Sequence, residues 1–239
     1  MITGAPLEAV LFDVGGPIAD ESEDFLFELR VISELIQEEI GREIDESEID
    51  EAWHRAISSW APSFIKSTIW QFLEPDRERT ISLYREAINR IFTHRQDVTL
   101  MEGVEELIPK LAEKYILALA GNQPEFMRDK LERTGLLKYF ASTILSSELG
   151  IAKPDSRFFL EICGRIGVAP QCCCMIGDRL DNDIYPANVL GMRTIWLRMG
   201  PHAMQQPRIP EDVPDATIES MPEVLGIIEG WERDESSRQ

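Results

Sequence analysis

The stretch LFDVGGPIAD, residues 11–20, leads two apolar residues into Asp13 and then breaks at two glycines and a proline. An apolar run that stops at Asp and Gly is typical of a buried strand that ends in a loop. The stretch alone leaves two interpretations of Asp13 open: an ordinary turn residue, or a catalytic nucleophile at the end of a strand. The sequence downstream has to distinguish between them.

The segment that follows, residues 19–97, shows only helical periodicity of its apolar residues. Asp45, with Glu48 three residues later, predicts a capped start for the second of its helices. Pro62 predicts the start of a third helix, and residues 77–92 have the pattern of a fourth. The segment is therefore expected to be a block of about four helices.

Beyond this block, helical and strand patterns alternate. The expected strands cover residues 115–120, 141–146, 172–177 and 193–197, and the expected helices cover residues 103–113, 124–134, 156–166 and 182–190. Such alternation implies a parallel sheet with right-handed crossovers. The strand predicted at residues 8–13 belongs to the same sheet, because a lone strand before a helical block has no other partner.

The sequence thus predicts an α/β fold with a doubly wound parallel sheet and an insertion. Residues 1–18 and 98–239 are expected to form the Rossmann-like core, and residues 19–97 the inserted all-helical cap. The polar tail, residues 231–239, is expected to fray.

The charge of the chain excludes some classes of partner. Among 239 residues, 24 are basic and 43 acidic, which gives a formal net charge of −19. Such a field repels nucleic acid and anionic membranes, although a small anionic substrate can bind where a metal ion or local cations offset the repulsion. No stretch approaches the length of a membrane span, and the first residues lack the pattern of a signal peptide. We therefore expect a cytoplasmic protein without a nucleic-acid or membrane partner.

Polar residues follow three of the predicted strands. Asp13 follows the first, Gly121 and Asn122 follow the second, and Asp178 opens the sequence DRLDND after the strand at 172–177. Ligands of open parallel sheets bind beyond the carboxyl ends of the strands, so these residues are expected to meet at one edge. The helical block leaves from that edge, where it is placed to act as a lid.

Three of these carboxylates predict a metal site. Asp13, Asp178 and Asp183 offer oxygen ligands of the kind that Mg²⁺ prefers when a phosphate shares the ion. A carboxylate beside a metal-bound phosphoryl group can attack phosphorus and form an acyl phosphate. Lys153, in the sequence GIAKPD, would balance the clustered negative charge. Taken singly, a surface lysine and a helix-capping Asp remain ordinary explanations for these residues.

The order of the motifs resembles that of the haloacid dehalogenase superfamily, whose members are mostly Mg²⁺-dependent phosphatases. The four stretches that carry the resemblance are LFDVGGP, LAGN, AKPD and IGDRLDND. The resemblance covers the whole chain except the tail, and it includes a helical cap after the first motif.

The resemblance implies roles for individual residues. It makes Asp13 the nucleophile and a metal ligand, the Gly15 carbonyl a second metal ligand, and Asp178 a third. Asp183 would be a further ligand, or a carboxylate that supports the ligands. Asn122 and Lys153 would hold the phosphoryl oxygens, with the backbone N–H of Gly121 beside them.

Three positions depart from the family pattern. Gly15 stands where family phosphatases carry the acid that protonates the leaving group, Pro17 replaces Thr or Val, and Gly121 replaces a hydroxyl residue. General acid–base help is typically worth about 10²–10⁴-fold in rate, so its loss is expected to slow attack on poorly activated esters without abolishing phosphoryl transfer.

The leading hypothesis is a Mg²⁺-dependent phosphatase that acts on a small phosphorylated metabolite through an aspartyl phosphate, as a monomer or homodimer. A catalytically weak binding or regulatory protein with the same fold is the alternative from another class. A 2-haloacid dehalogenase also lacks the second acid, but it does not need the carboxylates of GDRLDND. A phosphonate hydrolase would use a cap lysine as a Schiff base, for which Lys66 is the candidate.

Overall fold

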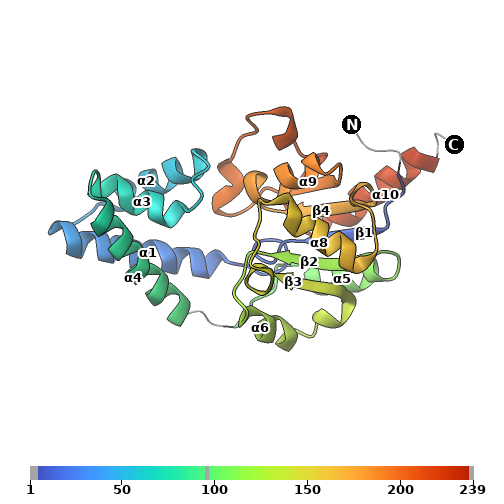
Figure 1. The fold of residues 1–239 in the computed structure, drawn as a ribbon, viewed down its shortest axis with the longest axis horizontal. Coiled ribbons are helices and arrows are strands. Elements are labelled where there is room, and N and C mark those ends of the chain that lie inside the picture. The colour runs from blue at the N-terminus through green and yellow to red at the C-terminus, as the bar shows by residue number, and fades with distance from the viewer. Residues whose placement is uncertain (1–4, 95–96, 237–239) are drawn as a thin grey trace. The chain divides into compact units, whose positions relative to one another are not determined.

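The computed structural model describes residues 5–94 and 97–236. These residues form two compact units. Figure 1 shows them with the colour running along the chain. The α/β unit comprises residues 5–20, 98–203 and 207–236. The helical unit comprises residues 21–94, residue 97 and residues 204–206.

A single six-stranded sheet forms the centre of the α/β unit. Its strands are β1 (Ala9–Phe12), β2 (Ile116–Gly121), β3 (Phe140–Leu145), β4 (Cys173–Gly177), β5 (Arg193–Leu197) and β6 (Ala216–Ile218). The strand order is β3-β2-β1-β4-β5-β6, and every neighbouring pair is parallel. The parallel sheet that the alternating pattern predicts is therefore confirmed, with β1 at its centre.

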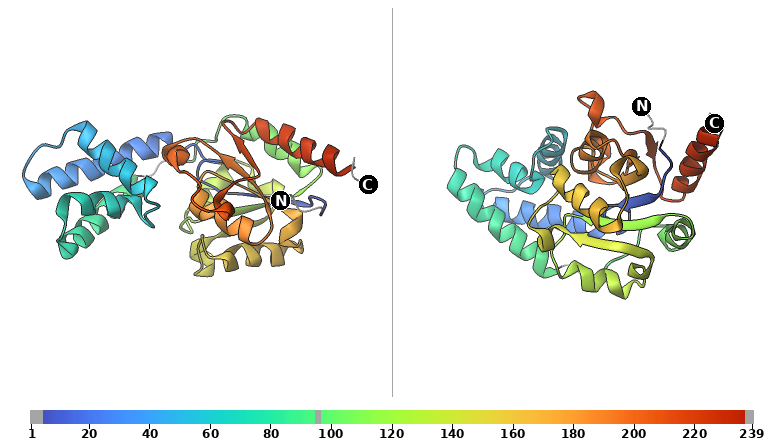
Figure 2. Two further views of the ribbon diagram at one scale, coloured as in Figure 1. Left: turned by 90° about the horizontal axis from the view of Figure 1, so that it is seen from above. Right: turned by 45° about the vertical axis from the view of Figure 1, so that its right-hand side comes forward.

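Helices cover both faces of this sheet. They are α5 (Val104–Ala112), α6 (Met127–Arg133), α7 (Ser146–Leu149), α8 (Ser156–Ile166), α9 (Tyr185–Val189) and α10 (Glu223–Ser236). Val10 and Phe12 face an apolar layer with α5, α6 and α10, whereas Ala9 and Leu11 face a second layer with α8 and α9. In the left view of Figure 2, α5 and α10 lie on one side of the sheet and α8 on the other. The sheet is doubly wound, as predicted.

Short helical turns connect some of these elements. Four are 3₁₀ turns at Leu137–Tyr139, Pro170–Cys172, Pro201–Met204 and Pro210–Asp212, and one is a π-helical turn at Leu180–Ile184. The π-helical turn follows β4 directly and leads into α9. It carries Asp183, one of the predicted metal ligands.

Four helices build the helical unit. They are α1 (Ser22–Ile40), α2 (Glu46–Ser58), α3 (Phe64–Leu73) and α4 (Arg77–His94). The predicted cap of α2 is present, since the Asp45 carboxylate accepts from Ser47 N–H and Glu48 accepts from Asp45 N–H. The prediction that Pro62 begins the third helix is wrong by two residues. Ser63 caps that helix, because its side chain accepts from the backbone N–H of Lys66.

Three features of the C-terminal region differ from the sequence prediction. The strand β6 and the helix α10 were not predicted from the sequence. The tail was expected to fray from residue 231, but α10 continues to Ser236 because Trp231 packs into the core. Residues 237–239 lie outside the described part of the chain.

Residues 204–206 group with the helical unit. Met204 packs against the apolar core of that unit, and its sulfur accepts a hydrogen bond from Ser58 Oγ at 3.6 Å. Across the described residues, we find no helix with both the length and the apolar character that a bilayer crossing requires.

Candidate active site

The predicted site residues come from the carboxyl ends of adjacent strands. Asp13 follows β1 and Asp178 follows β4, and these strands pair with Phe12 opposite Ile176. Gly121 ends β2, which flanks β1 on the other side. Because all three strands are parallel, their carboxyl ends lie at one edge of the sheet.

Three carboxylates converge at this edge. Asp13, Asp178 and Asp183 each place a carboxylate oxygen within 4.8 Å of the others. All three are buried, with 8%, 8% and 0% of each residue exposed. Buried charges are costly unless they are paired or coordinate a metal. A buried set of three carboxylates matches the oxygen donors that a hard divalent cation takes.

Lys153 supplies positive charge to two of the three. Its Nζ lies 2.8 Å from Asp13 Oδ1 and 2.6 Å from Asp183 Oδ1. Burial alone would lower the pKa of this ammonium group, but Asp13 and Asp183 outweigh burial and raise the pKa above its ordinary value. Lys153 is therefore charged at neutral pH, and it lies against the proposed nucleophile.

The π-helical turn positions the Asp183 carboxylate in the site. Asp183 Oδ2 accepts a hydrogen bond of 3.1 Å from the backbone N–H of Arg179, and Oδ1 accepts from Lys153. Burial raises the pKa of Asp183 to about 7, although Lys153 opposes this shift. A Cβ atom at Gly177 would collide with the Asp183 carboxyl group, so the last residue of β4 has to be glycine.

The turn after β1 also depends on a glycine. Gly16 has a φ of +79°, and a Cβ atom there would lie 3.0 Å from the Cβ of Asp178. Both facts favour glycine. Asp13 Oδ1 accepts from the backbone N–H of Val14 at 2.6 Å, and Gly15 pairs with Ala19 where the chain turns back.

Asn122 makes contacts that the sequence did not predict. Its side chain was expected to bind phosphoryl oxygens, but Nδ2 donates to the backbone carbonyl of Lys153 at 2.8 Å and Oδ1 accepts from the Lys153 N–H at 2.8 Å. The side chain therefore contacts the backbone of the residue that carries the site's cation.

The family assignment follows from comparison with known proteins. A family model described as haloacid dehalogenase-like hydrolase matches residues 7–191. The chain belongs to this family. The match includes Asp13, Lys153, Asp178 and Asp183.

Several relatives of this haloacid dehalogenase-like hydrolase are named phosphatases. A segment of 106 residues is 38% identical to glyceraldehyde 3-phosphate phosphatase of Methanopyrus kandleri and covers 44% of this chain. It spans only 46% of that relative. Phosphoserine phosphatase of Thermus thermophilus is 29% identical over 196 residues, which cover 76% of this chain and 75% of the relative. The crystal structure of a HAD phosphatase from Thermococcus onnurineus matches with a TM-score of 0.61 and 25% identity, over 94% of this chain and 99% of that one.

The structure also accounts for the family hydroxyl that is missing at Gly121. A Cβ atom at this position would lie 2.7 Å from Val14 Cγ2 and 3.3 Å from Val14 Cβ. A serine or threonine here would require Val14 to move.

Four neighbours of the site in this haloacid dehalogenase-like hydrolase were not predicted from the sequence: Arg179, Asp181, His202 and Trp196. Arg179 Nη2 lies 2.7 Å from Asp181 Oδ2, and this ion pair is mostly buried. Burial and the charge of Arg179 lower the pKa of His202 to about 3. Trp196 Nε1 donates to the backbone carbonyl of Asp178 at 2.8 Å. Only Arg179 and Asp181 had a local signal, since they lie inside the GDRLDND motif.

Proposed function

We propose that this chain is a Mg²⁺-dependent phosphatase that acts on a small phosphorylated metabolite through an aspartyl phosphate. The observation that carries the proposal is the convergence of three buried carboxylates and Lys153 at the ends of β1 and β4. The phosphatase names of the relatives support the same reaction class.

The donor set fits Mg²⁺, because the carboxylates present only oxygen atoms and lie close enough to share one ion. Asp13, Asp178, Asp183 and the Gly15 carbonyl would hold it. When bound, the ion would neutralise part of the phosphate charge and polarise the phosphoryl group.

Asp13 would act as the nucleophile. One of its oxygens attacks phosphorus, a P–O bond to Asp13 forms, and the P–O bond to the leaving group breaks. Lys153, which contacts Asp13, would attract the phosphoryl oxygens and favour the charge that develops on them. Water then cleaves the aspartyl phosphate, which releases phosphate and restores the carboxylate.

The leaving group receives no proton from position 15, because Gly15 carries no side chain. The leaving oxygen must depart as an anion, or it must take its proton from another group. We therefore propose that substrates with acidic leaving groups react faster than alkyl esters.

The absence of this acid also favours a second candidate function, a binding or regulatory protein of the same fold with little turnover. The two remaining alternatives receive less support. Asp178 and Asp183 are buried at the site, where a metal-free dehalogenase has no need of them. Lys66, the lysine that a phosphonate hydrolase would use, is exposed on α3.

A panel of phosphorylated metabolites, with p-nitrophenyl phosphate as an activated reference, tests the proposal when it is assayed with Mg²⁺ and with EDTA. Turnover that requires Mg²⁺ supports a phosphatase. No turnover of any compound, together with tight binding of one of them, would favour the binding protein. The role of the helical unit as a cap, the cytoplasmic location and the monomer or homodimer state stay predictions.

A further inference from the structure

Two connections of the α/β unit are joined near the site by the side chain of Asn122. Asn122 lies just after β2, at the start of the connection to α6, and Lys153 lies in the connection between α7 and α8. The Asn122 amide donates to the Lys153 carbonyl and accepts from the Lys153 N–H, at 2.8 Å in both cases. An amide that pairs with both polar groups of one residue fixes the position of that residue's backbone.

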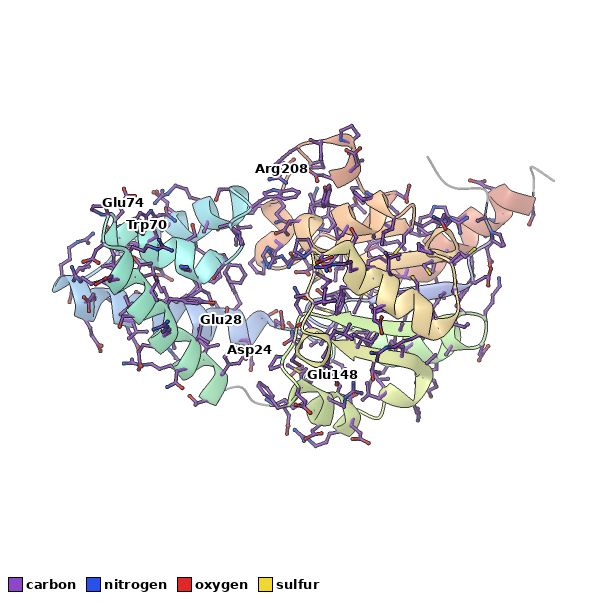
Figure 3. All side chains as sticks on the ribbon, in the orientation of Figure 1. Asp24, Glu28, Trp70, Glu74, Glu148 and Arg208 are labelled. Atoms are coloured by element: carbon purple, nitrogen blue, oxygen red, sulfur yellow. The ribbon has the colours of Figure 1, made fainter. Side chains whose placement is uncertain are left out.

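A second interaction joins the helices that adjoin these connections, α6 and α7. Arg128 on α6 donates to the carboxylate of Glu148 on α7. Glu148 is labelled in Figure 3. Arg128 also donates to the Thr143 carbonyl. This ion pair holds α7 beside α6, whereas the Asn122 amide holds the residue that carries the ammonium group.

The position of the Lys153 backbone matters because its side chain has two fixed contacts. Nζ reaches Asp13 Oδ1 at 2.8 Å and Asp183 Oδ1 at 2.6 Å, and the residue is 4% exposed. A buried ammonium group that serves two carboxylates tolerates little displacement, since each charge-assisted bond depends on distance and angle. Pro154, the next residue, has no N–H with which to fix the loop.

We propose that Asn122 is the positioning residue of Lys153 and acts on the reaction through the lysine, without binding the phosphoryl group itself. The inference rests on the proposed phosphatase function. It differs from the sequence-based expectation, which placed Asn122 on the phosphoryl oxygens. With a glycine at position 121, the end of β2 then contributes to the reaction through the Asn122–Lys153 contact and through its backbone.

Asn122 bonds the backbone of Lys153. The melting temperature and the reaction rate therefore distinguish a residue that positions Lys153 from one that binds the phosphoryl group. The variants are Asn122→Ala, Lys153→Met and the double variant, with Lys153→Gln as the second background if Lys153→Met does not fold. The melting temperature is measured without metal. The rate on p-nitrophenyl phosphate is measured with Mg²⁺, under single-turnover conditions for the slow variants.

A positioning role predicts a specific combination of results. Asn122→Ala lowers the melting temperature by roughly 2–8 °C in both backgrounds, because the lost bonds are to the backbone, which Lys153→Met retains. It lowers the rate by about 10–100-fold where Lys153 is present, as expected for a misplaced group, and has no further effect where Lys153 is absent.

The matched control is Asn188→Ala. The Asn188 amide also bonds backbone carbonyls, those of Glu211 and Val213, but these lie in another loop of the α/β unit. This variant loses stability and keeps its rate.

Two results would overturn the inference. A further rate loss from Asn122→Ala in the Lys153→Met background would show that Asn122 contacts the substrate directly. An unchanged melting temperature in Asn122→Ala would show that the amide does not hold the loop. Absence of turnover in the wild-type protein would reject the phosphatase function instead, and the melting temperatures would still report on the contact.

Discussion

The indole N–H of Trp196 donates a hydrogen bond of 2.8 Å to the backbone carbonyl of Asp178. Trp196 lies on β5 opposite Gly177, the last residue of β4, so its side chain reaches the turn where the carboxylate cluster begins. The bond is buried, and a buried carbonyl that loses its donor costs free energy. One side chain of a neighbouring strand therefore holds the backbone of a proposed metal ligand.

Trp196→Phe tests this relationship. Removal of the donor leaves the Asp178 carbonyl without this bond, and we expect the free energy of unfolding to fall by about 1–3 kcal/mol. The Mg²⁺ concentration that gives half-maximal thermal stabilisation should also rise. Trp231→Phe is the control. Trp231 lies on α10, where its ring contacts Arg193, and its substitution should leave the Mg²⁺ midpoint unchanged. An unaltered midpoint in Trp196→Phe would show that the bond does not position the ligand.

Mg²⁺ should raise the melting temperature of the wild-type protein. A ligand that binds only the native state stabilises it by mass action, and the three clustered carboxylates are the proposed ligands. Asp178→Ala should lose this shift. Asp155→Ala, which removes a carboxylate that caps α8 outside the cluster, should keep it. Equal shifts in wild type and Asp178→Ala would place the metal elsewhere in the protein.

Asp13→Asn tests the covalent step. The amide is a poor nucleophile, so the turnover of p-nitrophenyl phosphate should fall on the order of 10³-fold or more. The substitution retains the shape of the side chain, and circular dichroism should show an unchanged fold. Turnover close to that of the wild type would contradict an aspartyl phosphate on Asp13.

The sequence predicts the parts of the site that depend on local pattern. Asp13 and Asp178 each follow an apolar run, and such a run reads as a buried strand without knowledge of distant residues. The strand β6 has three residues, one of them exposed, and therefore carries too little periodicity to be recognised. The helix α10 was not predicted, because the charges at its C-terminal end suggested a solvated tail. In the structure Trp231 packs this helix against the core.

The other features that the sequence did not predict depend on contacts between residues distant in the chain. The sequence drew attention to Gly15, because a family acid is absent there, but the glycine that packs against Asp178 is its neighbour Gly16. Neither this close approach nor the bonds from Asn122 to Lys153 leave any trace in local composition. They depend on which loops the sheet brings together, and strand order is a property of the whole fold.

The pH dependence of stability should carry the signature of His202. Burial, with the charge of Arg179, lowers the pKa of His202 to about 3, whereas an unfolded histidine titrates near 6.5. As the pH falls below 6.5, His202 takes up a proton in the unfolded chain but stays neutral in the folded protein. Stability is therefore lost on acidification. The loss from this group is about 2 kcal/mol between pH 7 and pH 5.

His202→Gln should remove this part of the slope of unfolding free energy against pH. Denaturant unfolding of the metal-free protein at pH 7, 6 and 5 measures that slope. Asp183, whose pKa burial raises to about 7, acts in the opposite direction, and it does so in both proteins. His54→Gln, at an exposed position of α2, should leave the slope unchanged. Equal slopes for wild type and His202→Gln would mean that His202 takes up its proton in the folded protein.

The last prediction concerns the acid that position 15 lacks. If the leaving oxygen departs without a proton, kcat/KM of the wild-type protein should fall steeply as the pKa of the leaving group rises. Gly15→Asp should flatten this dependence, with a gain of up to about 10²-fold on alkyl esters. Gly15→Asn is the matched control, because it has the same size and no acidic proton. The thermal shift with Mg²⁺ must persist in both variants, since the backbone carbonyl of this residue is a proposed metal ligand. A flat dependence in the wild-type protein would mean that another residue already protonates the leaving group, and the proposed preference for acidic leaving groups would then be wrong.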